Sequence, residues 1–215
     1  MAKKALVVGA TGLIGRTLVD QLAAADHIRE VVTISRRPAP HSSTKVRNDV
    51  VDFERLDEFA SLFDGDLLFS CLGTTRNSAG SLEAQRRVDV DYQLRAAQLA
   101  ADKGVGHYLL VSSSGADVES RSAYLKMKGD LDQAVLQLPF ERISIFRPSL
   151  LLGEREELRI GEKLGGWLLP LLCTLPGLRR YRPIHGEQVA AKMVAVSAQP
   201  GSGVETFALD QLFSD

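Results

Sequence analysis

The sequence has little cysteine, no long uninterrupted apolar run and almost no net charge. Its two cysteines, Cys71 and Cys173, are too few for a disulfide framework. The longest apolar stretch, 164–178, is broken by glycines and prolines and is too short to span a bilayer. The net charge of −1 and the pI of about 6.4 give no field that would attract nucleic acid or an anionic membrane. We therefore expect a cytoplasmic protein with neither of these partners.

Metal and hydrolase motifs are missing as well. The histidines, His27, His41, His107 and His185, are scattered along the chain. Neither cysteine stands at metal-ligand spacing from any of them, so we expect no bound metal. No serine lies in a Gly-x-Ser-x-Gly elbow, which disfavours an esterase-like hydrolase.

Short apolar runs alternate with helical patterns along the chain. Strands are predicted at 5–8, 31–34, 67–71, 108–112 and 143–146, with weaker ones near 45–51 and 204–209. Helices are predicted at 12–25, 54–63, 81–103, 121–138 and 187–197. This alternation is typical of α/β proteins and predicts a Rossmann-type, doubly wound parallel sheet of about seven strands. At 215 residues the chain fits one domain, 1–215.

From about residue 151 the pattern changes. Charged residues at 154–157 are followed by the apolar stretch 167–178. We interpret 151–183 as a short segment that caps the substrate pocket, because ligands bind at the carboxyl ends of the strands in such sheets. This tail contains no motif that names a substrate.

The most informative motif follows the first predicted strand. Gly9-x-x-Gly12-x-x-Gly15 joins that strand to a helix, which is the arrangement that binds a dinucleotide pyrophosphate. Gly9 can adopt the backbone angles of the turn, Gly12 presents no side chain to a phosphate, and Gly15 lets helix and strand approach. The helix start adds free N–H groups and partial positive charge. We expect the cofactor to contact Gly9, Ala10, Thr11, Gly12, Leu13, Ile14 and Gly15.

Two arginines follow the second predicted strand, in the run Ser35-Arg36-Arg37. A site that prefers NAD usually has an acidic residue near this point, which binds the ribose 2′-hydroxyl. Arginine instead pairs well with a phosphate. The run therefore favours NADP(H) over NAD(H). The alternative is that both arginines are ordinary surface residues.

Two more strand ends are predicted to face the same cofactor. Asp52 and Phe53 follow the third strand, where Asp52 either lies beside the adenine or caps the next helix. After the fourth strand, backbone and hydroxyl groups are placed to contact ribose or phosphate. These residues are Cys71, Leu72, Gly73 and Thr74. A plain strand-to-loop turn is the alternative.

An acid–base site is predicted after the fifth strand. Tyr124 and Lys128 are one helical turn apart on one face, and Ser113 and Ser114 follow the strand itself. A free tyrosine ionises near pH 10, and a nearby ammonium favours the phenolate. A serine hydroxyl can hold a substrate carbonyl in line. These groups suit carbonyl reduction or alcohol oxidation; the alternative is a surface tyrosine beside a solvated lysine.

Together these motifs resemble the short-chain dehydrogenase/reductase superfamily, in its atypical, extended-like branch. Longer strings are similar to the Tat-interacting-protein family of NADPH-binding oxidoreductases. They are VDFE at 51–54, CLGTTR at 71–76, VDVDY at 88–92, SS at 112–113, GAD at 115–117, YL at 124–125, KG at 128–129 and FRP at 146–148. The likeness extends from the first strand to about residue 161.

The resemblance implies a Rossmann fold with NADPH on the glycine turn and its 2′-phosphate at Arg36 and Arg37. It implies that Tyr124 is the general acid/base and that Lys128 holds the nicotinamide ribose. It also implies that the nicotinamide is bordered by Arg147, Pro148, Ser149 and Leu150.

The chain departs from the family pattern in three ways. Extended members commonly carry an asparagine where this chain has Asp89, which puts an asparagine-mediated proton relay in doubt. Ser114 is serine, as in sugar-modifying relatives, whereas the animal Tat-interacting proteins have lysine there. The short tail argues against a bulky nucleotide-sugar substrate.

We predict an NADP(H)-dependent oxidoreductase that transfers hydride between nicotinamide and a small carbonyl or alcohol. One alternative is a non-catalytic NADPH-binding redox sensor or regulatory protein with a protein partner. Another is an epimerase or dehydratase that retains its cofactor. Helices 81–103 and 121–138 would suit a homodimer, although no apolar stripe establishes one.

Overall fold

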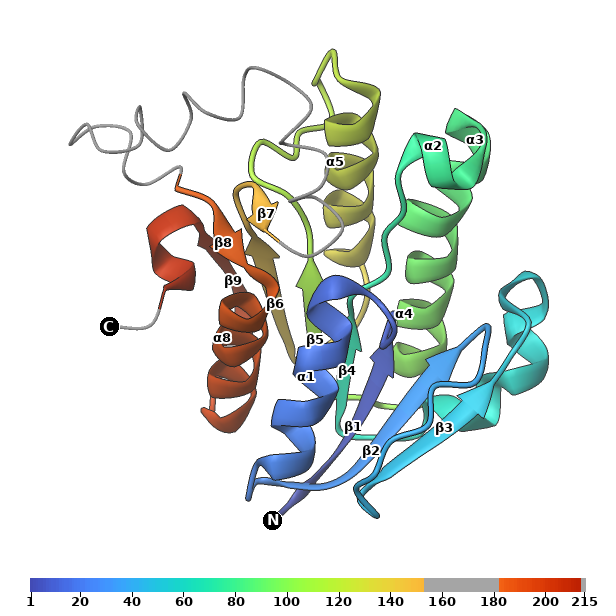
Figure 1. Ribbon diagram of the computed structural model, residues 1–215, viewed down its shortest axis with the longest axis vertical. Helices are drawn as coiled ribbons and strands as arrows, with labels where there is room; N and C mark the ends of the chain where they lie inside the picture. The colour runs from blue at the N-terminus through green and yellow to red at the C-terminus, as the bar shows by residue number, and fades with distance from the viewer. Residues whose placement is uncertain (153–181, 214–215) are drawn as a thin grey trace.

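The computed structural model describes residues 1–152 and 182–213, and within these ranges seven parallel strands form one sheet (Figure 1). Across the sheet the strands are β3 (Val46–Val50), β2 (Ile28–Ser35), β1 (Lys3–Val8), β4 (Leu67–Ser70), β5 (His107–Val111), β6 (Arg142–Arg147) and β9 (Gly203–Ala208). The strand order runs outward from β1 in both directions, so it reverses between β1 and β4. In open sheets of this kind, ligands bind at the carboxyl ends of the strands beside that reversal.

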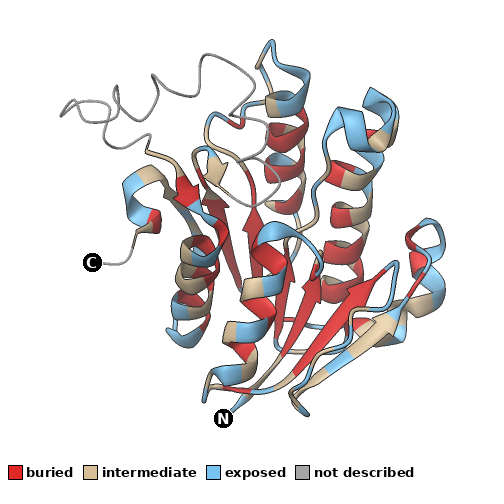
Figure 2. Ribbon diagram, in the orientation of Figure 1, coloured by how far each residue is buried: buried red, intermediate tan, exposed pale blue. Residues whose placement is uncertain are grey.

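Helices cover both faces of the sheet (Figures 1 and 2). One face carries α1 (Leu13–Ala24) and α8 (Gly186–Ala198). The other carries the 3₁₀ helix η1 (Phe53–Phe63), α4 (Tyr92–Asp102) and α5 (Ala123–Val135). Alternate side chains of a strand enter opposite cores, as in β1, where Leu6 and Val8 face α4 and α5 while Ala5 and Val7 face α1 and α8. Burial on both faces explains why the strands are continuous apolar runs.

The predicted doubly wound parallel sheet is confirmed, but two predicted helices differ from regular α-helix. Residues 53–63 form 3₁₀ turns instead, and the backbone angles at Arg55 and Phe59 are not helical, so the segment is kinked. The predicted helix 81–103 contains α3 (Leu82–Arg86), a π turn η2 (Arg87–Asp91) and then α4. The shorter elements are α2 (Arg76–Ala79) and the 3₁₀ helix η4 (Leu209–Leu212).

A small second sheet, which the sequence did not predict, follows the carboxyl end of β6. Here β7 (Leu151–Leu152) pairs in parallel with β8 (Ile184–His185). The Ser149 hydroxyl also donates to the carbonyl oxygen of Arg182 at 2.6 Å. The two described parts of the chain therefore meet at this point. Most of the predicted cap 151–183, including the stretch 167–178, lies outside the described residues.

Candidate functional site

The glycine turn between β1 and α1 permits close backbone approach. Gly9 has a φ of +84°, and a Cβ at this position would collide with the backbone of Cys71 at the end of β4. A Cβ on Gly15 would collide with the carbonyl oxygen of Gly9. Gly12 is the exposed N-cap of α1, and no side chain of the described residues caps this helix start. The N–H groups of the first turn of α1 therefore have no side-chain partner among the described residues and can bind an anion such as a diphosphate.

We expect Gly9→Ala to destabilise the protein more than Gly104→Ala. Both glycines have positive φ, +84° and +80°, so an alanine at either is strained by about 1 kcal/mol. No described atom lies within 4 Å of a Cβ built at Gly104, whereas one built at Gly9 meets backbone. The collision adds about 1–3 kcal/mol. Urea unfolding of both variants measures the difference, and equal losses would contradict a close approach at Gly9.

The end of β2 presents two cations. The Ser35 hydroxyl donates to the carbonyl oxygen of Arg37 at 2.7 Å and accepts from the Asn48 side-chain amide at 2.9 Å. These bonds fix the turn that follows the strand. Arg36 and Arg37 are both exposed there. Their guanidinium groups are thus free of burial and stand at the strand end where a Rossmann site distinguishes a ribose hydroxyl from a phosphate.

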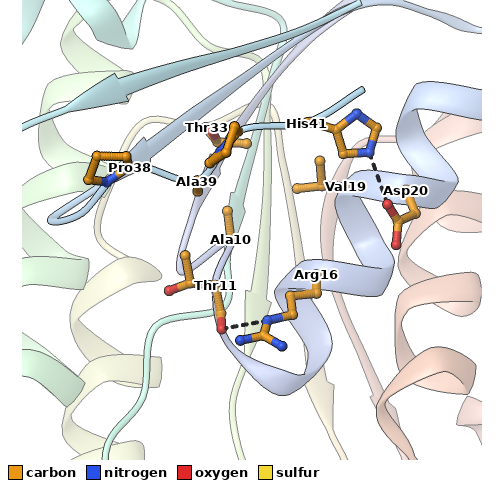
Figure 3. Close-up of a pocket in the computed structure, with 10 residues that line it drawn as sticks. Ala10, Thr11, Arg16, Val19, Asp20, Thr33, Pro38, Ala39 and His41 are labelled. Atoms are coloured by element: carbon orange, nitrogen blue, oxygen red, sulfur yellow. Dashed lines mark hydrogen bonds and ion pairs between the residues drawn. The ribbon is translucent and has the colours of Figure 1, made fainter. Parts of the chain in front are cut away.

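A pocket of about 360 Å³ runs from the glycine turn toward the loop after β2 (Figure 3). Thr11 borders it on the turn, and Arg16 borders it from α1, with its Nε donating to the Thr11 carbonyl oxygen at 3.2 Å. At the far end, His41 Nε2 lies 2.9 Å from Asp20 Oδ1. Sequence reasoning missed Arg16, because a cation just beyond the motif has the same pattern as any exposed helical arginine.

The residues after β3 have structural partners. Asp52 caps η1, and its Oδ1 accepts from the N–H of Glu54 at 3.0 Å. Phe53 is buried, and its ring centroid lies 5.5 Å from that of Tyr92. The structure thus shows the capping alternative for Asp52. A contact of Asp52 or Phe53 with an adenine stays a prediction.

The end of β4 lies beside the glycine turn. The Cys71 N–H donates to the Val8 carbonyl oxygen at 2.9 Å, and Leu72, Gly73 and Thr74 follow in the loop. Burial raises the pKa of the Cys71 thiol to about 12, and the Lys128 ammonium opposes this only in part. Burial therefore favours the protonated thiol, which is the less nucleophilic form. Gly73 is exposed, so the backbone here is accessible to a ligand.

Helix α5 brings the predicted acid–base residues to the same edge of the sheet. Its N-cap Ser122 accepts from the Leu125 N–H. Tyr124 is 40% exposed, whereas Lys128, one turn further on, is only 4% exposed. A Cβ on Gly129 would collide with the backbone at 117–118, so α5 packs directly on the loop after β5. A phenol open to solvent is therefore combined with an ammonium held inside the protein.

The serines after β5 separate into two groups. Ser112 is buried, and its hydroxyl donates to Asp132 Oδ2 at 2.9 Å. Ser113 and Ser114 are half-buried in the loop on which α5 packs. The Ser114 N–H donates to the carbonyl oxygen of Pro148 at 2.9 Å, which joins the loops after β5 and β6. Ser113 and Ser114 both stay predictions for the hydroxyl that contacts substrate.

Arg147 is bound to a buried carboxylate. Its Nε and Nη2 donate to Asp132 Oδ2 at 3.1 and 2.9 Å. Burial raises the pKa of Asp132, and the Ser112 hydroxyl and Arg147 oppose that rise. The following residues, Pro148, Ser149 and Leu150, lead from β6 into β7 at the carboxyl edge. Their contact with a nicotinamide stays a prediction.

A second buried carboxylate, which sequence reasoning did not place in the site, faces α5. Asp89 Oδ1 lies 3.5 Å from Lys128 Nζ. Asp89 Oδ2 accepts from the Thr74 N–H at 3.3 Å. Burial raises the pKa of Asp89, and the Lys128 ammonium is the main influence that lowers it. The π turn presents this carboxylate, and Gln93 stabilises the turn by donating to the Asp89 carbonyl oxygen at 2.7 Å.

One family profile and several known proteins are similar to this chain. The profile of the NAD dependent epimerase/dehydratase family matches residues 5–126. Protein HTATIP2 of Rattus norvegicus is 42% identical over 166 residues, which are 75% of this chain and 68% of that protein. Protein FMP52, mitochondrial, of Eremothecium gossypii is 37% identical over 200 residues, 90% of this chain and 88% of that protein. Among solved structures, MoeE5 in complex with UDP-glucuronic acid and NAD superposes with a TM-score of 0.72 at 20% identity, covering 96% of this chain and 76% of that chain.

The expectation of a cytoplasmic protein is wrong. Relatives named FMP52 from three fungi are described as mitochondrial, which contradicts it. Low cysteine content and a near-neutral charge do not separate one compartment inside the cell from another, so composition could not have decided this. Within residues 1–152 and 182–213, no helix is both long enough and apolar enough to cross a membrane.

The comparisons agree with the fold seen in the structure. The family profile spans more than half of the chain and includes most of β1, the glycine turn, β2 to β5 and Tyr124. The likeness to MoeE5 shows the same Rossmann fold. The chain belongs to the NAD dependent epimerase/dehydratase family, and its relatives HTATIP2 and FMP52 place it in the Tat-interacting-protein-like, atypical branch of the short-chain dehydrogenases/reductases.

Proposed function

We propose that the protein is an NADP(H)-dependent oxidoreductase that acts on a small carbonyl or alcohol. Membership of the family supports an enzyme with a pyridine-nucleotide cofactor. The observation that carries the reaction class is the pair on α5, in which the exposed Tyr124 phenol stands one turn from the buried Lys128 ammonium. The pair lies at the carboxyl edge of the sheet, where the glycine turn also lies.

In carbonyl reduction, each of these residues has a separate role. Reduced nicotinamide, when bound, supplies the hydride. The Tyr124 hydroxyl donates the proton that the carbonyl oxygen takes up, and in the reverse direction it accepts the proton of the alcohol. The hydroxyl of Ser113 or Ser114 donates a hydrogen bond to the same oxygen and orients it. The buried Lys128 ammonium places a positive charge one helical turn from the Tyr124 hydroxyl.

The proposed preference for NADP(H) is supported by the charges around the adenosine end of the site. Arg36 and Arg37 are exposed at the end of β2, and Arg16 borders the pocket that runs from the glycine turn. Asp20, the acidic residue in that pocket, is paired with His41. The three arginines outnumber this one carboxylate, so the net charge at this end of the site is positive, which suits a 2′-phosphate better than a ribose hydroxyl.

We expect the double variant Arg36→Ala/Arg37→Ala to bind NADPH about 10- to 100-fold more weakly. A hydrogen bond to a charged group is worth about 1.5–3 kcal/mol, and NADH lacks the phosphate that would receive it. Its affinity should change little. Calorimetric titration of both nucleotides gives the ratio, and Arg29→Ala, at the other end of β2, is the matched control. Equal losses for NADPH and NADH would remove the arginines from nucleotide discrimination.

The reaction class is tested by NADPH oxidation with a panel of small aldehydes and ketones. Turnover on any of them supports the proposal. If the protein binds NADPH, turns over no carbonyl and captures a protein partner only when NADPH is present, the function is that of a redox sensor instead.

A second candidate is an epimerase or dehydratase that keeps its cofactor through the cycle. The family description favours it, and MoeE5, which shares the fold, binds a nucleotide sugar and NAD. Cofactor that stays bound through purification and desalting would favour this candidate, because a reductase must exchange its nucleotide in each turnover.

A further inference from the structure

A buried ion pair connects the acid–base helix to the loop after β4. The side chains of Asp89 and Lys128 are 1% and 5% exposed, and Oδ1 lies 3.5 Å from Nζ. Asp89 belongs to the π turn η2, and its other oxygen accepts from the Thr74 N–H. A Cβ on Gly73 would stand 3.4 Å from Oδ1, so the carboxylate lies directly against this loop. The pair therefore fixes where the ammonium sits relative to the predicted cofactor loop.

The other charged or titratable groups around Lys128 leave Asp89 as its counter-ion. Asp132, one turn further along α5, accepts two bonds from Arg147 of β6 and one from Ser112. Burial raises the pKa of the Cys71 thiol, at the end of β4, and so disfavours a thiolate there. Asp89 receives no such guanidinium among the described residues, and Lys128 is the cation within ion-pair distance of it. Two neutral pairs thus result, Asp132 with Arg147 and Asp89 with Lys128.

The net charge around Lys128 contributes to the electrostatic field at the Tyr124 hydroxyl. Tyr124 and Lys128 are four residues apart on α5 and share one face of the helix. An ammonium alone stabilises the phenolate of a nearby tyrosine, whereas an ammonium with a buried carboxylate beside it exerts a weaker field. An asparagine at position 89 would leave the ammonium uncompensated.

We propose that Asp89 is a positioning residue that fixes the Lys128 ammonium and offsets its charge, so that Tyr124 stays in the phenol form that donates a proton to a carbonyl oxygen. The inference deepens the proposed reductase function and rests on it. The neutral pair suits the site to reduction, in which Tyr124 gives a proton to the carbonyl oxygen.

The test compares Asp89→Asn with Asp91→Asn, which removes the same charge from an exposed position of the same π turn. Tyrosinate absorbance is titrated in each full-length protein and in its Tyr124→Phe counterpart, and the difference isolates Tyr124. Asp89→Asn is expected to move the appearance of the Tyr124 phenolate down by about one pH unit, and Asp91→Asn to leave it in place. Identical titrations in the two variants would overturn the proposal.

A second variant covers the case in which Asp89→Asn does not fold. Asp89→Asn/Lys128→Met removes both charges of the pair, which is less damaging than leaving one charge buried alone. If the two charges offset each other, the phenolate of Tyr124 appears at the same pH as in the native protein. A rise of about one pH unit would mean that Lys128 acts unopposed, and it would overturn the proposal.

Activity provides the last readout. With NADPH and a reducible carbonyl, the alkaline limb of the kcat profile is expected to move down in Asp89→Asn by the same amount as the phenolate titration. If the phenolate titration shifts in Asp89→Asn but the alkaline limb of the kcat profile does not, Asp89 does not act through proton donation by Tyr124, and the proposal is overturned. If the titration shifts but no carbonyl is reduced by the native protein, the charge coupling stands and the proposed reductase function fails.

Discussion

Tyr124→Phe is expected to lower kcat for carbonyl reduction by about 10²–10⁴-fold, the usual contribution of a general acid. The substitution removes one oxygen and keeps the ring. Because Tyr124 is 40% exposed, the change leaves the core intact and alters stability by less than about 0.5 kcal/mol. The nucleotide is held chiefly by the glycine turn and the arginines, so the Kd for NADPH is expected to stay the same. Initial rates at saturating NADPH, with calorimetry beside them, separate the two effects.

Tyr108→Phe is the matched control for this variant. Tyr108 loses the same hydroxyl, but it is wholly buried in β5, and burial raises the pKa of its phenol. It has no access to a substrate and should leave kcat unchanged. Native turnover in Tyr124→Phe would exclude Tyr124 as the proton donor, and a matching loss in Tyr108→Phe would assign the effect to the core.

The sheet was predictable because its strands are buried on both faces. A run such as Ala5–Val8 is apolar without alternation for that reason, and the glycines at 9, 12 and 15 mark a turn where backbone approaches backbone. The π turn was not predictable from the sequence. A single extra residue within the predicted helix 81–103 leaves no clear mark on the spacing of its apolar residues. The β7–β8 pair was not predictable either, because two residues are too few to show the alternation of side chains that marks a strand.

In the candidate site, local spacing was predictable and long-range pairing was not. Four residues of separation on one helix were enough to relate Tyr124 to Lys128. The same spacing continues to Asp132, yet only the packing of β6 on the sheet shows that Arg147 neutralises it. Asp89 drew notice as a departure from a family asparagine, and its ion pair with Lys128 requires the π turn to face α5.

Acid is expected to destabilise the protein through His107, by about 2 kcal/mol at pH 5 and on the order of 4 kcal/mol near pH 3. This histidine is buried at the start of β5, and its Nε2 lies 2.7 Å from the Ser144 hydroxyl. Burial, and then the charges of Arg142 and Lys3, lower its pKa from 6.5 to about 3. The unfolded chain takes up a proton below pH 6.5 and the folded protein does not. Its contribution to stability is therefore complete above that pH and is lost as the pH falls toward 3.

His107→Gln keeps a side chain that can pair with Ser144 but cannot titrate. Urea unfolding at a series of pH values should show that the variant loses about 2 kcal/mol less than the native protein between pH 7 and pH 5. His185→Gln, at an exposed position, controls for the replacement of a histidine as such. Burial raises the pKa of Asp89 and Asp132, so these carboxyls act in the opposite direction in acid and are present in every variant compared. If His107→Gln and the native protein lose stability in parallel, the acid sensitivity arises elsewhere, and the buried imidazole is not the group that stays neutral in the fold.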